Sequence, residues 1–306
     1  MGISSRSLTD VDFEVNLGFV LGVGLRFSLP VCSVYSMPGG YLVAMSPTKL
    51  MRWLTCPTFG YLDERWEPTG PWTPNRLLGM MMHTAINASL THQDAPGSTL
   101  RELDRGYPTD EEPVWTKEAL LTLINKALPK VLGVIENFGE SFLASELTIG
   151  DGRVDLVTQR EQDKGQPLVV TDFKTSLQLS TYLATKNMAE AQSDWQLLDY
   201  TWRVSEYYQK PVIARRRVLI VLTPQVKVYC ETFDTTTTLD MWRRTMLKEE
   251  AYVESLKDLP LADLPMRTTN CYGRYGKCRF YEFCWIAGKD EQRAGGLYNH
   301  RRIESI

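Results

Sequence analysis

Residues 152–157 read Gly-Arg-Val-Asp-Leu-Val, and residues 168–175 read Leu-Val-Val-Thr-Asp-Phe-Lys-Thr. Each stretch is a short, largely apolar run that carries an acid, Asp155 in the first and Asp172 in the second. The polar, glycine-containing segment between them is typical of a hairpin connection. Because side chains alternate along a strand, we expect Asp172 and Lys174 on one face and Phe173 on the other. The pattern predicts two neighbouring strands that bring carboxylates and an ammonium group together.

Two interpretations of these charges are open. In the first, the hairpin lies at the surface and Asp172 pairs with Lys174 in solvent. In the second, the four apolar or β-branched residues before Asp172 place it at the end of a buried strand, where a charge is costly unless it is paired or bound to a metal. Carboxylates are hard oxygen ligands for divalent cations, and a neighbouring ammonium suits the activation of water. We therefore favour a metal site.

The composition excludes several classes of protein. The 306 residues are 43% hydrophobic and 23% charged, which is ordinary for a globular chain. The net charge of −3 means that any nucleic-acid surface must be a local patch. The apolar stretch 17–34 is interrupted by Arg26, Ser28 and Pro30 and is preceded by acids, so we expect neither a signal peptide nor a membrane span. An intracellular, cytoplasmic location is the resulting expectation.

The remaining patterns predict helices before, within and after a sheet. Ser46 and Pro47 form a typical helix start, and apolar residues recur at helical spacing further on. The predicted helices are 46–56, 76–90, 117–138, 180–209 and 239–256, with a loop over 91–115. The further predicted strands are 142–149, 218–222 and 226–233.

This order of elements predicts an α/β fold. Its core would be a mixed β-sheet flanked by helices, with a helical elaboration near the start and a cysteine-rich end. We treat 1–40 as a poorly specified N-terminal extension and 41–306 as one domain.

Three further side chains stand out on the predicted elements. His83 lies in the helix over 76–90, where a histidine is either structural or a ligand. Glu146 lies on an otherwise apolar strand, either as a further acid near the metal or as an acid that faces solvent. Gln196 and Tyr200 are four residues apart and therefore share one face of a helix.

The cysteines point to a metal or a cluster. Disulfides are disfavoured in a reducing compartment. Three cysteines lie within a short segment near the end of the sequence: Cys271, Cys278 and Cys284. A fourth, Cys56, lies far from them in the sequence and precedes Pro57. They contain no C-x-x-C pair, which is the usual spacing of a zinc knuckle. Four thiolates suit either a structural zinc or a [4Fe–4S] cluster, and their spacing alone does not choose between them.

Several motifs in this order resemble the RecB-like branch of the PD-(D/E)XK nuclease superfamily. They are Gly79-x-x-x-His83, Gly152-Arg153-x-Asp155, Asp172-Phe173-Lys174-Thr175 and Gln196-x-x-x-Tyr200. Ser46-Pro47-x-Lys49-Leu50, Cys56-Pro57 and the three late cysteines resemble its iron–sulfur subgroup, which includes CRISPR-associated RecB-like exonucleases and the AddB nuclease domain. The resemblance covers roughly residues 45–286. Each motif is weak singly, and their order makes them specific.

The resemblance implies a restriction-endonuclease-like fold and a metal-dependent deoxyribonuclease. It implies that His83, Asp155, Asp172 and the carbonyl of Phe173 would hold Mg²⁺ or Mn²⁺. A histidine beside carboxylates favours Mn²⁺. Lys174 would orient or help to deprotonate the attacking water and stabilise the transition state. Gln196 and Tyr200 would support the catalytic residues Asp155, Asp172 and Lys174 and contact DNA.

The resemblance also implies that Cys56, Cys271, Cys278 and Cys284 hold a [4Fe–4S] cluster, with Zn²⁺ as the alternative. Such a cluster would tie together the two ends of the domain. We expect Cys56→Ala or Cys284→Ala to cost stability first and activity second.

The implied substrate is DNA, as single strands or ends, which an exonuclease would hydrolyse during replication, recombination or repair in a bacterium or a phage-infected host. No G-K-[ST] phosphate loop is present, so a helicase partner would be a separate chain. Arginine clusters such as 215–217 are either DNA contacts or an ion-paired face. The alternative function is a catalytically silent DNA-binding or scaffold subunit. The presence of His83, Asp155, Asp172 and Lys174 favours the enzyme.

Overall fold

The computed structural model describes residues 45–68, 73–107, 115–235, 239–273, 276–285, 288–289 and 300–302. Contacts between Cα atoms divide the chain into Met1–Gly40 and Tyr41–Ile306, and all described residues belong to the second unit. The extension predicted over 1–40 therefore lies outside the described residues. Within the described part, no helix is long and apolar enough to cross a membrane.

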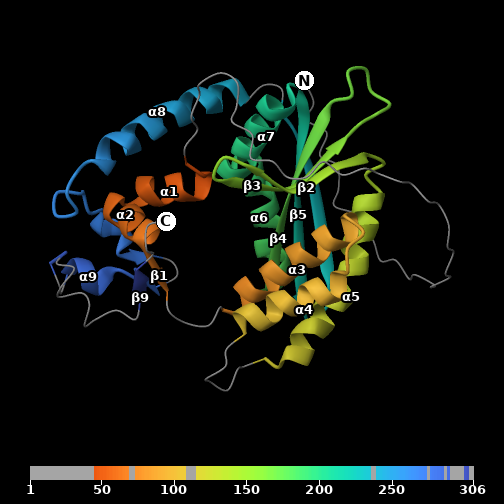
Figure 1. The fold of residues 1–306 in the computed structure, drawn as a ribbon, viewed down its shortest axis with the longest axis horizontal. Coiled ribbons are helices and arrows are strands. Elements are labelled where there is room, and N and C mark those ends of the chain that lie inside the picture. The colour runs from red at the N-terminus through yellow and green to blue at the C-terminus, as the bar shows by residue number, and fades with distance from the viewer. Residues whose placement is uncertain are drawn as a thin grey trace. The chain divides into compact units, whose positions relative to one another are not determined.

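A mixed five-stranded sheet forms the centre of the fold (Figure 1). Its strands, in spatial order, are β2 (Ser141–Ile149), β3 (Gly152–Gln159), β4 (Leu168–Gln178), β5 (Val212–Thr223) and β6 (Lys227–Asp234). Neighbours run antiparallel except β4 and β5, which are parallel. A parallel pair needs a crossover, and here it consists of α6 (Thr181–Glu190), η1 (Ala191–Ser193) and α7 (Trp195–Tyr208). The predicted mixed α/β sheet is confirmed.

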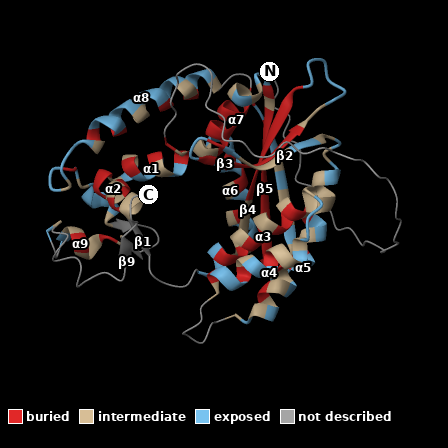
Figure 2. Ribbon diagram, viewed as in Figure 1, coloured by how far each residue is buried: buried red, intermediate tan, exposed pale blue. Residues whose placement is uncertain are grey.

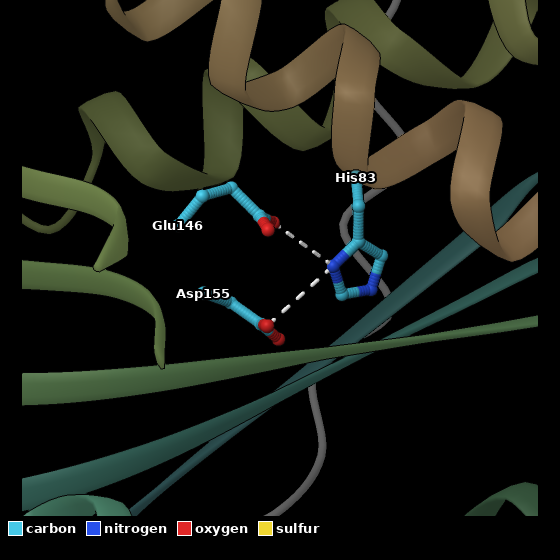
Figure 3. Close-up of side chains that lie close together, drawn as sticks. All are labelled: His83, Glu146 and Asp155. Carbon is cyan, nitrogen blue, oxygen red and sulfur yellow. Dashed lines mark hydrogen bonds and ion pairs between the residues drawn. The ribbon is translucent and has the colours of Figure 1, made fainter. Parts of the chain in front are cut away.

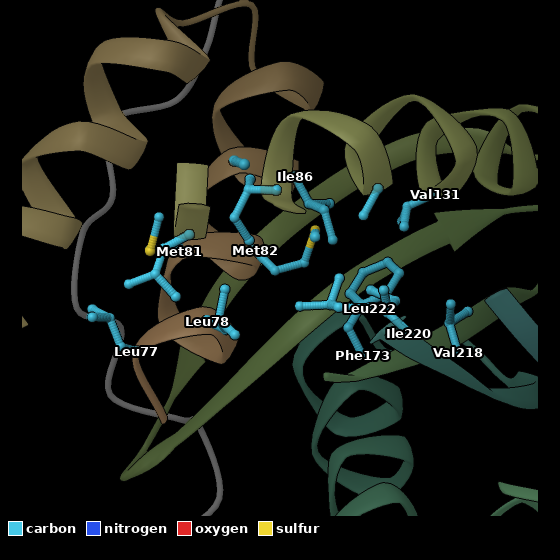
Figure 4. Packing of buried hydrophobic residues seen from close by; sticks show 14 of the residues in the cluster. Leu77, Leu78, Met81, Met82, Ile86, Val131, Phe173, Val218, Ile220 and Leu222 are labelled. Atoms are coloured by element: carbon cyan, nitrogen blue, oxygen red, sulfur yellow. The ribbon is translucent and has the colours of Figure 1, made fainter. Parts of the chain in front are cut away.

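Helices cover both faces of the sheet. One face packs against α3 (Pro74–Leu90), α4 (Ala95–Gly106) and α5 (Lys117–Glu136) through a core that includes Phe173 and Ile220 (Figure 4). On the other face, Val170 packs with Leu197 and Val204 of α7. Figure 2 shows the buried residues concentrated in the strands and on the inner sides of these helices. The alternation along β4 therefore sends Phe173 into the α3–α5 layer and leaves Asp172 and Lys174 on the side of α7.

The helices from the beginning and the end of the described chain lie together. Helix α1 (Pro47–Thr55) begins at Ser46, whose side chain accepts a hydrogen bond from the Lys49 amide as the sequence predicts. It contacts α7 and α8 (Leu239–Lys257) around Trp53 and Trp202. Nearby, α2 (Pro57–Arg65) packs against α9 (Tyr281–Trp285) through Leu62 and Phe283.

The short elements link the same two parts of the chain. Strand β1 (Trp66–Pro68), which follows α2, pairs antiparallel with β9 (His300–Arg302). The remaining short elements are η2 (Thr268–Asn270), β7 (Tyr272–Gly273) and β8 (Gly276–Lys277). Together with the contact between α2 and α9, the β1–β9 pair brings the end of the described chain back to its beginning.

Two predicted elements differ from the structure. The loop predicted over 91–115 contains helix α4, which begins with Asp94 as its cap and Pro96 in its first turn, where proline is well tolerated. The single helix predicted over 180–209 is interrupted at η1. The side chain of Asp194 accepts a hydrogen bond from the Leu197 amide and so caps a new helix. This interruption reorients the chain immediately before Gln196.

A buried ion pair fixes α7 in place. Arg203 donates to the Asp199 carboxylate at 2.6 Å and also to the carbonyl oxygens of Ile149 and Met45. It thereby ties α7 to the end of β2 and to the segment before α1. Burial raises the pKa of Asp199 to about 6. Burial, and then repulsion by Asp199, raise the pKa of Glu250 on α8 to about 7.

We predict that Glu250→Gln makes the protein more stable at pH 8 but not near pH 4.5. Because the folded-state pKa of Glu250 is raised, ionisation between the unfolded value near 4.5 and the folded value near 7 favours unfolding. The glutamine variant avoids this cost. The measurement is thermal unfolding at both pH values, with the exposed Glu254→Gln as control. An equal shift at both pH values would contradict the prediction.

Candidate active site

Asp172 is fully buried and lies between two cationic side chains. One carboxylate oxygen, Oδ1, is 2.9 Å from Lys174 Nζ, and the other, Oδ2, is 2.9 Å from Arg217 Nε. Arg217 is brought there by the parallel register, which pairs it with Asp172 across β4 and β5. A buried carboxylate is costly without such partners. The full burial of Asp172 excludes the surface-hairpin interpretation.

Asp155 is joined to the backbone of β4. Its Oδ2 accepts a hydrogen bond of 2.7 Å from the Phe173 amide, between Asp172 and Lys174. Its other oxygen, Oδ1, is 3.5 Å from His83 Nδ1. The two strands thus place both acids beside one peptide segment.

His83 reaches the same segment from α3 (Figure 3). The buried side chains of α3, Met82 and Ile86 among them, fix the helix on the sheet (Figure 4). His83 points from this helix toward the acids. Its Nε2 is 3.1 Å from the carbonyl oxygen of Phe173, and its Nδ1 is 3.3 Å from Glu146 Oε1. His83, Glu146 and Asp155 each offer a ligand atom within 4.8 Å of the others.

Glu146 lies beside the acids and not in bulk solvent. Its neighbours Ser145 and Leu147 pair with Leu156 and Val154, so Glu146 lies opposite Asp155 in the hairpin. Its φ of 51° is in the left-handed region, which costs a residue other than glycine roughly 1–3 kcal/mol. Counting residue pairs outward from the turn at residues 150–151 pairs Glu146 with Asp155. This count could have placed Glu146 beside the acids from the sequence.

Gln196 and Tyr200 support Lys174 from α7. Lys174 Nζ donates to Gln196 Oε1 at 2.8 Å, and Gln196 Nε2 donates to the Tyr200 hydroxyl at 2.8 Å. Asp194 is 2.8 Å from Nη2 of Arg217. A chain of polar contacts therefore runs from the start of α7 to both sides of Asp172.

The electrostatics of the site balance buried anions against cations. Burial would lower the pKa of His83, but the charges of Asp155 and Glu146 raise it to about 10. Burial opposes ionisation of Asp155, yet His83, Lys174 and the Phe173 amide hold its pKa below the usual range. Burial and the charge of Asp155 outweigh Lys174 and Arg217 and raise the pKa of Asp172.

The donor set fits a divalent cation. Carboxylates and a backbone carbonyl are typical ligands of both Mn²⁺ and Mg²⁺, and the imidazole favours Mn²⁺ over Mg²⁺. Among the described residues, the group close enough to share one ion is His83, Glu146 and Asp155. Asp172 lies outside this group because its two oxygens face Lys174 and Arg217.

The three arginines at 215–217 are buried in β5, which argues against their interpretation as DNA contacts. Arg215 donates to the carbonyl oxygens of Asp234 and Gln192. Arg216 makes two hydrogen bonds to Glu140. The sequence did not indicate the role of Arg217 beside Asp172, because a run of three arginines is more typical of a surface.

Among the described residues, the four cysteines outside the sheet lie apart from the acids. The Cys278 amide donates to the Cys271 carbonyl at 2.8 Å, and Cys278 and Cys284 pack against the Leu62–Phe280–Phe283 cluster. Burial, and then the charges of the three other thiols, Cys56 included, raise the pKa of Cys284 to about 12. Cys230 is exposed on β6.

The model of the PD-(D/E)XK nuclease superfamily matches residues 44–284. A crystal structure from Eubacterium rectale, described as a candidate exonuclease, is similar with a TM-score of 0.41 and 10% sequence identity. That match covers 71% of this chain and 79% of the other. No curated protein sequence matches this chain.

We predict that Arg217→Met destabilises the protein by roughly 3–5 kcal/mol, because it leaves Asp172 buried with one cation fewer. The double variant Asp172→Asn/Arg217→Met should regain part of this loss, since the buried carboxylate that Arg217 balances is then removed as well. The recovery should be incomplete because Lys174 and Asp194 each lose a partner. Chemical denaturation measures both, with the exposed Arg244→Met as control. If Arg217→Met unfolds like the control, the ion pair does not hold the site together.

Proposed function

This chain belongs to the PD-(D/E)XK nuclease superfamily, and we propose that it is a metal-dependent deoxyribonuclease of the RecB-like branch. Residues 41–306 would form the nuclease domain. The observation that carries the proposal is the convergence of Asp155, Asp172, Lys174 and His83 around the Phe173 peptide. A purely structural role does not require two buried carboxylates side by side, because each raises the cost of burying the other.

The catalytic metal that we propose is Mn²⁺ or Mg²⁺. Asp155, His83 and the Phe173 carbonyl would hold it, and the position of Glu146 adds a further carboxylate to this set. Asp172 would join these ligands only by exchanging its contact with Lys174 or Arg217 for the ion. When bound, such a cation lowers the pKa of a water molecule and neutralises charge on a phosphate. The imidazole among the donors favours Mn²⁺.

The remaining polar side chains would act on the water and on the phosphate. Lys174 Nζ is held between Asp172 and Gln196, from where it can donate to the attacking water or to a phosphate oxygen. Gln196 fixes that position, and Tyr200 in turn holds the Gln196 amide. Arg217 acts as a positioning residue for Asp172.

We also propose that Cys56, Cys271, Cys278 and Cys284 hold a [4Fe–4S] cluster. One zinc ion would draw four sulfurs to about 2.3 Å from the metal, so that they would lie close together. Among the described residues, no three of these thiols meet within 4.8 Å. A four-iron cluster keeps its ligand sulfurs farther apart, because each binds a different iron atom. The resemblance of the cysteine motifs to the iron–sulfur subgroup, and not this spacing, favours the cluster over zinc.

The substrate that we propose is DNA, as single strands or ends, cut by an exonuclease that works in replication, recombination or repair. A helicase or recombination partner would be a separate chain. The free cysteines of the described residues suit the cytoplasm of a bacterium or a phage-infected host. The alternative of a silent scaffold subunit is disfavoured because the acids, His83 and Lys174 are all present and in mutual contact.

We predict that Asp172→Asn and Lys174→Met each lower nuclease activity at least about 100-fold, because each removes charge from the reacting centre. Lys164→Met, in the exposed connection between β3 and β4, should cut like wild type. The assay uses end-labelled single- and double-stranded DNA with Mn²⁺ or Mg²⁺ and anaerobically purified protein. No cutting of either DNA by well-folded wild type would overturn the proposal.

We predict that Cys284→Ser lowers both the bound iron and the melting temperature, since it removes one cluster ligand and the link between the two ends of the domain. Wild type should contain about four iron atoms per chain. Cys230→Ser, which changes an exposed cysteine elsewhere, is the matched control. Elemental analysis that finds zinc in place of iron would refute the cluster.

A further inference from the structure

A cavity of about 420 Å³ opens between α1, α2 and the start of α7. Figure 1 shows α1 beside α7, and the two helices are in contact. We call this cavity the α1–α7 pocket. Its lining residues are Pro47, Thr48, Met51, Arg52, Thr55, Phe59, Asp194, Trp195 and Gln196.

The α1–α7 pocket borders the candidate active site, because two of its lining residues contact residues of that site. Gln196 lines the pocket and also accepts the hydrogen bond from Lys174 Nζ at 2.8 Å. Asp194 lines it too and is 2.8 Å from Arg217, which in turn pairs with Asp172. A ligand in this pocket would therefore be the immediate neighbour of any group that reacts beside Lys174.

The walls of the pocket suit a flat, apolar group. Trp195 is half-buried at the start of α7, Phe59 lies opposite on α2, and Met51 of α1 is 40% exposed. Apolar and aromatic side chains of this kind bind the faces of nucleobases and need no particular base sequence.

The pocket also has a positively charged side chain, Arg52, beside its apolar walls. Arg52 lines the pocket and pairs with Asp63, to which Arg279 is also bound. The second arginine leaves positive charge in excess over the single carboxylate. On the other side of the pocket, Asp194 shares Arg217 with Asp172, so a carboxylate faces the pocket near the candidate active site. The pocket thus combines apolar walls with a guanidinium, as a site for a nucleotide requires.

We propose that the α1–α7 pocket receives one unpaired nucleobase next to the phosphate that is cut. The inference rests on the proposed nuclease function and gives it a substrate preference. A volume of about 420 Å³ lies in the range of pockets for small ligands and is sufficient for one nucleotide. Because the base is unpaired, the enzyme has to take this nucleotide from a single strand or a frayed end.

The test is a series of single-stranded oligonucleotides, each with one abasic site at a successive position around the cleaved bond. Stacking of one base on aromatic side chains contributes a factor of about 5 to about 150. We expect one position at which the missing base lowers kcat/KM at least about 5-fold in wild type. In Trp195→Ala and Met51→Ala this penalty should shrink toward one.

The readout is the ratio of kcat/KM between abasic and complete DNA for the same enzyme. This ratio cancels the amount of folded protein, so that a destabilised Trp195→Ala sample still gives an answer. Tyr252→Ala removes an exposed aromatic side chain of α8 that does not line the pocket, and it should keep the full penalty. If no position shows a penalty, or if the penalty persists in both pocket variants, the base pocket is refuted while the nuclease stands.

A second experiment distinguishes failure of the proposed base pocket from failure of the proposed nuclease function. If wild type cuts no DNA with Mn²⁺ or Mg²⁺, the affinities of the same oligonucleotides are measured by fluorescence anisotropy without metal. A loss of affinity at one abasic position, absent in Met51→Ala, would support the pocket without the activity. Equal affinities for all oligonucleotides would overturn the pocket as well.

Discussion

The structure depends on burying two neighbouring carboxylates, Asp155 and Asp172, without leaving their charge unbalanced. Each would be costly alone, and their proximity raises the cost further. Cationic side chains from three elements offset this cost of burial: His83 from α3, Lys174 from β4 and Arg217 from β5. Because these elements are two adjacent strands of the sheet and a helix packed on one of its faces, the balance of charge and the packing of the fold depend on each other. A bound divalent cation would take the place of the His83 proton, because an imidazole that binds a metal is neutral.

The same constraint explains features outside the carboxylates. The parallel pairing of β4 with β5 places Arg217 beside Asp172, and the break in the crossover helix places Asp194 and Gln196 where they meet Arg217 and Lys174. A continuous helix over 180–209 would not turn the chain at this point. Asp194 and Gln196 also line the α1–α7 pocket. The side chains that hold Arg217 and Lys174 therefore border the pocket as well.

The sequence predicts those parts of the site that follow from local periodicity. Alternation along a strand is enough to place Asp172 and Lys174 on one face, and a helix places Gln196 above Tyr200. It does not predict the burial of Arg217, because only the tertiary structure supplies its acidic partners. Helix α4 was not predicted because Pro96 and Gly97 are typical of loops, although proline is also well tolerated in the first turn of a helix. The position of Glu146 opposite Asp155 follows from the strand register, which has to be counted from the turn and does not follow from local periodicity.

The central claim is that the buried acids form a metal site, and the most direct measurement is binding of Mn²⁺ observed by electron paramagnetic resonance in the absence of DNA. The account predicts that wild type binds Mn²⁺, that Asp155→Asn loses most of this binding, and that Gln196→Ala, which does not alter a metal ligand, keeps it. Equal binding by wild type and Asp155→Asn would contradict the account, because the carboxylates would then serve only to balance charge within the fold.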